Sequence, residues 1–268
     1  MQRERQYRSS SLKETAVPLR GEMFRAEVIE IGRGDPVLYL HGIWDRGPNE
    51  FLEAISDRLR ITVPSHPGFG GSTGEENLTD IHDLVYYYLD LLDKLGLKGI
   101  PLVGHSLGAM IAAELAAVQP DRFTKLVLIS ALGLWNEDRP SIDFFAVSRD
   151  ELAAAVYGGS DLRESFDVEP EDQQAKIEYT LDRAKSRAAA ARFLWPIPNK
   201  GLHKRIHRIA APTLLVWGER DGIVPTHYGQ DFKERITNAS IEVIEGAAHL
   251  VHLEHPGRVG ELVAEFIG

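Results

Sequence analysis

The sequence predicts an α/β fold with a mostly parallel sheet flanked by helices. Short apolar runs alternate with amphipathic helical stretches through the first half of the chain and again near its C-terminus. Several runs contain no polar residue, which is typical of strands buried on both faces of a parallel sheet. Of the 268 residues, 43% are hydrophobic and 26% are charged, so the chain has the composition of a globular protein that can bury a core.

The first strands follow a short polar lead. Residues 1–20 are rich in arginine and lack the apolar stretch of a signal peptide, so we expect a solvated tail that ends in an edge strand. Residues 24–31 alternate apolar and polar side chains and predict a half-buried strand, which a turn at 32–35 closes. The apolar runs at 36–40 and 61–63 predict the next strands.

Alternation of helix and strand continues to residue 129. Thr79 is the predicted N-cap of an amphipathic helix that ends at Gly96. Residues 101–103 predict a short buried strand, residues 106–118 a helix, and residues 126–129 another strand.

Residues 131–211 interrupt this alternation, because no strand is evident among them. Ser148 begins a capping box, and Pro170 opens a longer helix. We therefore expect an α/β core of residues 1–130 and 212–268, with residues 131–211 inserted as a helical cap, or lid. The core resumes with predicted strands at 213–217 and 241–244 and a final helix at 258–267.

Charge and cysteine content limit the partners and the chemistry. The chain has 30 basic and 40 acidic residues, a net charge of −10, and no clustered basic stripe, which disfavours nucleic acid or an anionic membrane as a partner. No apolar run approaches the roughly 18 residues that span a bilayer, so we expect a cytoplasmic protein. The absence of cysteine excludes disulfides, thiolate metal sites and a cysteine nucleophile. We expect neither metal nor other cofactor, and chemistry by oxygen and imidazole.

Residues 104–108, Gly-His-Ser-Leu-Gly, match the pattern G-x-S-x-G between a predicted strand and a predicted helix. Glycines on both sides of the serine allow a tight turn that lifts the hydroxyl above the C-terminal edge of the sheet, at a helix N-terminus. Ser106 is therefore the predicted nucleophile. We expect His105 to pack beneath it rather than to accept its proton.

A serine nucleophile needs a base, and an acid that orients the base. Asp221 lies in a turn after a buried strand and is the predicted acid; Glu219 competes, but we expect it to point to solvent. His249 follows the last strand, at the edge where open α/β sheets bind ligands, and is the predicted base. For the nearby His252 and His255 we expect surface or helix-capping roles.

An oxyanion needs two N–H donors. The N–H of Leu107 begins the predicted nucleophile helix, and that of Ile43 follows His-Gly in the loop after the third strand. Trp44, beside it, is expected to line a pocket for a mid-sized, partly apolar group. The residues of the cap that we expect to complete this pocket are Trp135, Phe144, Phe193 and Trp195.

Five short motifs stand at the ends of predicted strands. They are His41-Gly42, Pro67-Gly68-Phe69-Gly70-Gly71-Ser72, Gly104-His105-Ser106-Leu107-Gly108, Trp217-Gly218-Glu219-Arg220-Asp221 and Gly246-Ala247-Ala248-His249. Together they resemble the α/β-hydrolase superfamily, from about residue 22 to the end of the chain. The resemblance implies an α/β-hydrolase fold of eight strands with a helical cap after the sixth. It also implies nucleophile, acid and base roles for Ser106, Asp221 and His249.

Departures from the patterns of particular branches narrow the expected activity. Ser106 replaces the aspartate nucleophile of haloalkane dehalogenases and epoxide hydrolases. The His41 motif lacks the extra glycines of hormone-sensitive-lipase-like esterases, and Ala109 replaces a glycine frequent in C–C bond hydrolases of aromatic degradation and in cofactor-free haloperoxidases. We therefore expect a serine hydrolase that cleaves small carboxylic esters through an acyl-enzyme.

Two alternatives remain. A meta-cleavage-product hydrolase would split a C–C bond in a dienoic keto-acid, and Arg192 of the cap could bind the substrate carboxylate, although a solvated helix position is the commoner role. Some proteins of this fold are non-catalytic binding modules, but the presence of serine, acid and histidine disfavours that reading. The sequence makes no prediction about oligomeric state.

Overall fold

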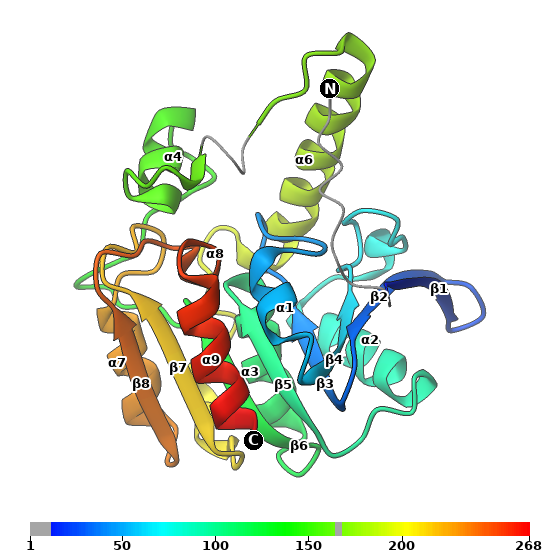
Figure 1. Ribbon diagram of the computed structural model, residues 1–268, viewed down its shortest axis with the longest axis vertical. Coiled ribbons are helices and arrows are strands. Elements are labelled where there is room, and N and C mark those ends of the chain that lie inside the picture. The colour runs from blue at the N-terminus through cyan, green and yellow to red at the C-terminus, as the bar shows by residue number, and fades with distance from the viewer. Residues whose placement is uncertain (1–11, 164–167) are drawn as a thin grey trace.

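A computed structural model describes residues 12–163 and 168–268 and shows one eight-stranded, mostly parallel sheet (Figure 1). This confirms the predicted α/β-hydrolase fold. The strand order is β1-β2-β4-β3-β5-β6-β7-β8, with β1–β2 and β2–β4 antiparallel and the remaining pairs parallel. The strands are β1 (Lys13–Leu19), β2 (Phe24–Gly32), β3 (Asp35–Leu40), β4 (Leu59–Pro64), β5 (Ile100–His105), β6 (Phe123–Ile129), β7 (Thr213–Gly218) and β8 (Ala239–Ile244).

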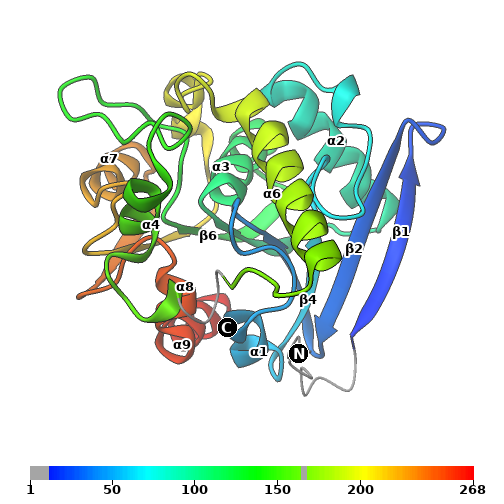
Figure 2. The same cartoon turned by 90° about the horizontal axis from the view of Figure 1, so that it is seen from above.

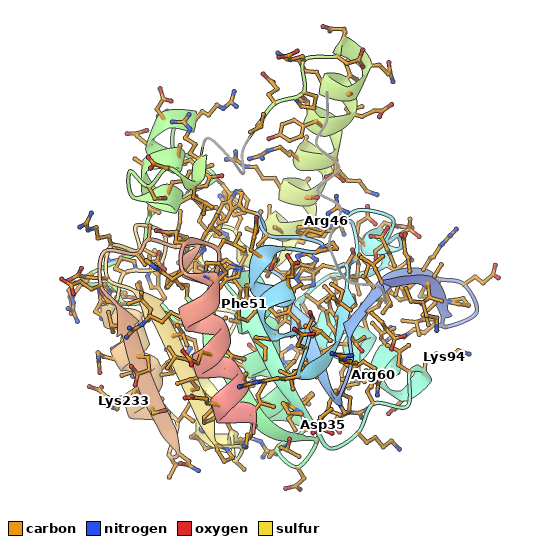
Figure 3. The ribbon with its side chains drawn as sticks, in the orientation of Figure 1. Asp35, Arg46, Phe51, Arg60, Lys94 and Lys233 are labelled. Atoms are coloured by element: carbon orange, nitrogen blue, oxygen red, sulfur yellow. The ribbon has the colours of Figure 1, made fainter. Side chains whose placement is uncertain are left out.

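Helices cover both faces of the sheet. Helices α1 and α9 contact each other on one face, and α2 and α3 lie on the other (Figure 2). Figure 3 shows Phe51 of α1 within the core and Arg46 near α6. The helices are α1 (Glu50–Ile55), α2 (Ile81–Lys94), α3 (Leu107–Val118), α4 (Arg149–Tyr157), α6 (Gln173–Leu194), α7 (His227–Arg235), α8 (Val251–Glu254) and α9 (Pro256–Ile267), with short 3₁₀ turns at Glu75–Asn77, Leu202–Lys204 and Ile206–Arg208.

The central strands are buried along their carboxyl halves. Leu102, Leu128 and Leu215 are each 0% exposed. Their burial on both faces explains why these strands are unbroken apolar runs in the sequence. No helix in the described part of the chain has the length and apolar character needed to cross a bilayer.

The start of α2 differs from the prediction by one residue. Asp80, rather than Thr79, is the N-cap, and its carboxylate accepts hydrogen bonds from the N–H groups of His82 and Asp83. Thr79 instead donates its N–H and hydroxyl to the Asp83 carboxylate. Aspartate can accept two first-turn N–H groups here, which makes it the better cap.

The regular elements of the segment between β6 and β7 are helices, where the segment is described. Residues 131–211, called here the inserted segment, contain α4 and α6 and no strand among their described residues. Ser148 forms the predicted capping box with Glu151, and Asp172 caps α6. Both helices lie beyond the carboxyl ends of the parallel strands (Figure 1).

The turn between β5 and α3 is built on very close backbone contacts. A Cβ atom at Gly108 would lie 2.0 Å from the carbonyl oxygen of Leu40, and one at Gly104 would lie 2.5 Å from the carbonyl oxygen of Gly108. Ser106 between them has φ 53° and ψ −111°, in the left-handed region that side chains rarely adopt. Both glycines of the motif are therefore required by packing of α3 against the ends of β3 and β5.

We predict that Gly108→Ala destabilises the protein by about 3 kcal/mol or more, the upper range for overpacking, because the new methyl group meets backbone atoms. Gly257→Ala, in the first turn of α9, is the matched control, since nothing lies within 4 Å of its Cβ position. Urea unfolding measures both variants. Equal stability of the two would contradict the close contact between α3 and β3.

Candidate active site

Ser106, His249 and Asp221 come from three different strand ends and meet in the structure. The Nε2 atom of His249 lies 3.0 Å from Ser106 Oγ, and its Nδ1 atom lies 3.0 Å from both carboxylate oxygens of Asp221. Ser106 and His249 are fully buried, and Asp221 is 5% exposed. With the Nδ1–H donating to the carboxylate, Nε2 is left as an acceptor for the serine hydroxyl, which is the arrangement that proton transfer from serine requires.

Backbone hydrogen bonds set the direction of the Asp221 carboxylate. Its Oδ1 atom accepts the N–H groups of Ile223 at 2.9 Å and Val224 at 2.8 Å. Glu219, the competing acid, is exposed and accepts the N–H of Gly246 at 2.9 Å. Asp221 is therefore the carboxylate that contacts His249.

Two backbone donors flank the nucleophile. Leu107 is the first residue of α3, so its N–H is one of those that a helix leaves unpaired at its N-terminus. Ile43 lies in the loop after β3, which packs directly on the nucleophile turn: a Cβ atom at Gly42 would lie 2.6 Å from His105 Nδ1. This close approach brings the predicted donors, Ile43 and Leu107, into neighbouring turns.

The last turn of α4 contacts both the acid and the base loops. The carbonyl oxygen of Ala155 accepts the N–H of Gly222, and that of Val156 accepts the N–H of His249, each at 3.2 Å. At Gly158, which caps α4 with φ 57°, a Cβ atom would lie 2.8 Å from the Cβ of Ala248. The C-terminal turn of α4 therefore helps to fix the loops that carry Asp221 and His249.

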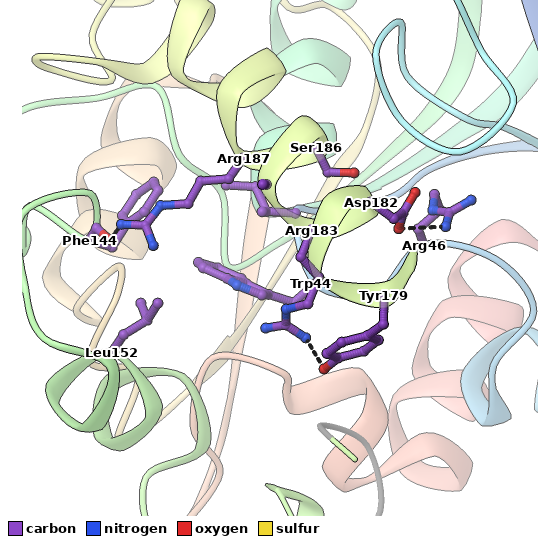
Figure 4. A pocket seen from close by; sticks show the side chains of 11 residues that line it. Trp44, Arg46, Phe144, Leu152, Tyr179, Asp182, Arg183, Ser186 and Arg187 are labelled. Atoms are coloured by element: carbon purple, nitrogen blue, oxygen red, sulfur yellow. Dashed lines mark hydrogen bonds and ion pairs between the residues drawn. The ribbon is translucent and has the colours of Figure 1, made fainter. Parts of the chain in front are cut away.

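A cavity of about 520 Å³ lies between the loop after β3 and the inserted segment (Figure 4). Trp44 and Phe144, two of the residues expected to line a substrate pocket, line this cavity. Trp135, Phe193 and Trp195 are not among its lining residues. Phe193 is buried on the core side of α6, and Trp195 is 56% exposed where α6 ends. The lining residues are Ile43, Trp44, Arg46, Phe144, Leu152, Tyr179, Asp182, Arg183, Ala184, Ser186 and Arg187.

Three arginines and one aspartate, Asp182, line the cavity and give it a cationic wall that was not predicted from the sequence. Arg46 pairs with Asp182 at 3.0 Å, and Arg187 donates to the carbonyl oxygen of Phe144 at 3.0 Å. Arg183 lies one helical turn from Arg187, and the two share one face of α6. The spacing of Arg183 and Arg187, four residues apart in a predicted helix, was the signal in the sequence that could have revealed this wall. Arg192 lies outside this lining, is exposed and donates to the carbonyl oxygen of Leu78.

Trp44 lines the cavity and also contacts His249. Its ring meets that of His249 edge-on, with centroids 5.6 Å apart, and meets that of Phe144 at 5.7 Å. Ser106 and His249 are fully buried and do not line the cavity. The cavity therefore adjoins the His249 ring through Trp44.

A second buried polar group lies beneath the nucleophile. His252 is 0% exposed and its Nε2 atom lies 3.1 Å from Asp45 Oδ2, so the expected surface or capping role was wrong for this residue. His255 does cap α9 and is exposed. Among the described residues, Asp45, His105 and His252 form the group that could chelate a metal ion. Both Asp45 oxygens already accept hydrogen bonds from the chain, from the Tyr39 hydroxyl and the Gly42 N–H.

Comparisons with known proteins bear on the family and the fold of the chain. The sequence profile of the alpha/beta hydrolase fold family matches residues 35–256. The chain is 28% identical over 266 residues to a 2-hydroxy-6-oxononadienedioate/2-hydroxy-6-oxononatrienedioate hydrolase of Pseudomonas putida, covering 89% of this chain and 90% of that one.

Solved structures show the same fold. A serine hydrolase involved in carbazole degradation superposes with a TM-score of 0.77 at 20% identity, covering 96% of this chain and 99% of the other. A bacterial membrane phospholipase A superposes with a TM-score of 0.76 at 22% identity, covering 96% and 86%. At these identities the likeness establishes the fold alone.

Glu254 should make the stability of the protein depend on pH. Its carboxylate accepts the N–H of Ala248 at 3.0 Å, next to His249. Burial, together with the nearby charge of Asp221, raises its pKa from 4.5 to about 7, against the opposing effect of the Ala248 hydrogen bond. A carboxyl with a raised pKa binds more protons when folded, so its contribution to stability is lost as pH rises from about 4.5 to about 7.

We predict that Glu254→Gln removes this loss, so that its stability relative to wild type is higher at pH 8 than at pH 5. Chemical unfolding at intervals across that range measures the difference. Glu219→Gln is the control, because that carboxylate also accepts a loop N–H but is exposed. A constant difference between Glu254→Gln and wild type at all pH values would contradict the raised pKa.

Proposed function

Because the chain belongs to the alpha/beta hydrolase fold family, we propose that this hydrolase cleaves carboxylic esters through an acyl-enzyme on Ser106. The observation that carries the proposal is the position of His249, which lies within hydrogen-bond distance of both Ser106 and Asp221 in a fully buried setting. Such an arrangement is required for serine to act as a nucleophile at neutral pH.

In the first half of the reaction, Ser106 Oγ attacks the ester carbonyl carbon as its proton passes to His249 Nε2. Asp221 stabilises the imidazolium that results. The N–H groups of Ile43 and Leu107 bind the developing oxyanion; loss of one such donor costs about 10²- to 10³-fold in kcat in related chemistry. The tetrahedral species collapses, and the alcohol leaves with the proton from His249. Water then attacks the acyl-serine by the same steps and regenerates Ser106.

We assign substrate selection to the inserted segment acting as a cap over a core of residues 1–130 and 212–268. Most residues that line the cavity belong to this segment, and its helix α6 supplies Arg183 and Arg187 of the cationic wall. The N–H groups of Gly222 and His249 donate to carbonyl oxygens of α4. These hydrogen bonds support a cap whose α4 end stays fixed. Trp44 then contacts the acyl or aryl group that enters from the cavity.

We predict that Ser106→Ala lowers kcat on short-chain aryl esters by at least about 10⁴-fold, since removal of the nucleophile leaves only binding and oxyanion stabilisation. Ser130→Ala is the matched control: Ser130 is also buried at the end of a parallel strand, with φ 47°. A spectrophotometric assay of aryl ester hydrolysis measures kcat for both variants. Ester turnover that survives in Ser106→Ala would rule out the mechanism.

Hydrolysis of a C–C bond in a dienoic keto-acid is the second candidate, and the cationic wall favours it. Such substrates carry a carboxylate, which arginine binds through two parallel hydrogen bonds. The Pseudomonas putida relative is named for the hydrolysis of dienedioates, which carry two carboxylates. In this chain Arg183 and Arg187 line the cavity, so they replace Arg192 as the proposed carboxylate anchors.

The two candidates make different predictions for Arg183→Gln. If the substrate is an anionic keto-acid, KM for that substrate rises by about tenfold or more, the effect of losing one charged hydrogen bond of about 1.5–3 kcal/mol, while KM for a neutral aryl ester stays unchanged. Arg192→Gln is the control. Assays with esters graded by chain length, run beside one dienoic keto-acid, measure these KM values. If the protein turns over the keto-acid far faster than every ester, C–C hydrolysis replaces ester cleavage as the proposed function.

A further inference from the structure

A buried carboxylate outside the triad connects the loops that carry the reacting groups. Asp45 lies in the loop after β3 and is 0% exposed. Its Oδ1 atom accepts the N–H of Gly42 at 2.6 Å, and its Oδ2 atom accepts the hydroxyl of Tyr39 at 2.5 Å. The Nε2 atom of His252, on α8 beyond the base loop, lies 3.1 Å from Oδ2. Asp45 is thus hydrogen-bonded both to the part of the loop after β3 that carries Ile43, called here the oxyanion loop, and to α8, which follows His249.

His105 extends this connection to the nucleophile turn and to the base itself. It directly precedes Ser106, and its Nδ1 atom lies 3.0 Å from Asp45 Oδ1. On the other side of the ring, Nε2 lies 3.0 Å from the carbonyl oxygen of His249. A carbonyl oxygen only accepts hydrogen bonds, so His105 Nε2 is the donor. The His105 ring therefore lies between the carboxylate of Asp45 and the backbone of His249.

The charges of this group favour an ionised Asp45. Burial by itself raises the pKa of the Asp45 carboxyl, but the charge of His105 and the hydrogen bonds of His105 and His252 outweigh burial and hold that pKa well below its usual value. Burial lowers the pKa of His252 to about 4, so this ring is neutral at pH 7 and donates through one nitrogen only. An ionised carboxylate without water is stable only when several donors converge on it, which ties those donors to one geometry.

We propose that Asp45 is a positioning residue of the active site, whose carboxylate fixes the loop of Ile43, the turn of Ser106 and the loop of His249 relative to one another. The hydrogen bonds among Ser106, His249 and Asp221 do not include the oxyanion loop, whereas those of Asp45 do. Displacement of a reacting group by about 1 Å costs about 10²-fold in rate. This proposal rests on the serine-hydrolase function proposed above.

The test is Asp45→Asn, which keeps the shape of the side chain and removes its charge. We expect kcat on the best aryl ester to fall by about 10- to 100-fold with KM within about twofold of wild type. An alkyl fluorophosphonate gives a readout that needs no knowledge of the substrate: Ser106 Oγ bonds to phosphorus, fluoride leaves, and His249 takes the serine proton. Its labelling rate should fall by the same factor as kcat.

A matched control separates positioning from stability. Glu114 of α3 is also a carboxylate with 0% exposure, and Arg205 binds it at 2.6 Å away from the catalytic loops. Glu114→Gln should lower the unfolding temperature and leave both kcat and the labelling rate of the folded protein unchanged. A purely structural role for Asp45 predicts the same result for Asp45→Asn, which would overturn the proposal.

If Asp45→Asn does not fold, substitutions of His252 test the same connection. His252→Phe keeps a ring against Phe51 but removes the hydrogen bond to Asp45, so kcat should fall at unchanged KM; His252→Gln, whose amide can donate, should restore it. Wild-type kcat in both variants would overturn the proposal. Failure of the wild-type protein to react with the fluorophosphonate would instead overturn the serine-hydrolase function.

Discussion

The structure of the site depends on the close approach of the first turn of α3 to the carboxyl end of β3. The backbone at Gly108 lies so near the carbonyl oxygen of Leu40 that no side chain fits, and Ser106 accepts a left-handed conformation between the two glycines. Strain of this kind persists only where the surrounding packing determines it. Here that packing places the serine hydroxyl, the N-terminus of α3 and the loop of Ile43 together, which is the arrangement that attack on a carbonyl needs.

Burial then gives each polar group of the site a defined direction. Asp221 and Asp45 are both carboxylates in the protein interior, and both accept backbone N–H groups, from Ile223 and Val224 in one case and from Gly42 in the other. Hydrogen bonds are stronger in such a low-dielectric environment, but unpaired groups are more costly there. The α4 carbonyl that accepts the N–H of His249 adds a further constraint from the inserted segment.

Local motifs predicted the fold, and the predicted acid, base and serine lie together in the structure, because the carboxyl ends of parallel strands meet at one edge of a sheet. Long-range contacts could not be predicted in this way. Asp45 and His252 are 207 residues apart, and a lone histidine before a helix is typical of a surface position. The cationic wall was missed because the direction of α6 is set by packing against the core, which also leaves Trp195 exposed instead of in the cavity.

The central claim is that Ser106 forms a covalent acyl intermediate. Incubation with an activated aryl carbamate tests it most directly, because carbamoyl-serines hydrolyse slowly enough for intact-protein and peptide mass spectrometry. If Ser106 forms the acyl-enzyme, one carbamoyl group per chain is found, and it is located on Ser106. Ester turnover is then lost in proportion to the modification. Ester turnover abolished by the carbamate while Ser106 stays unmodified, or full turnover by carbamoylated Ser106, would contradict it.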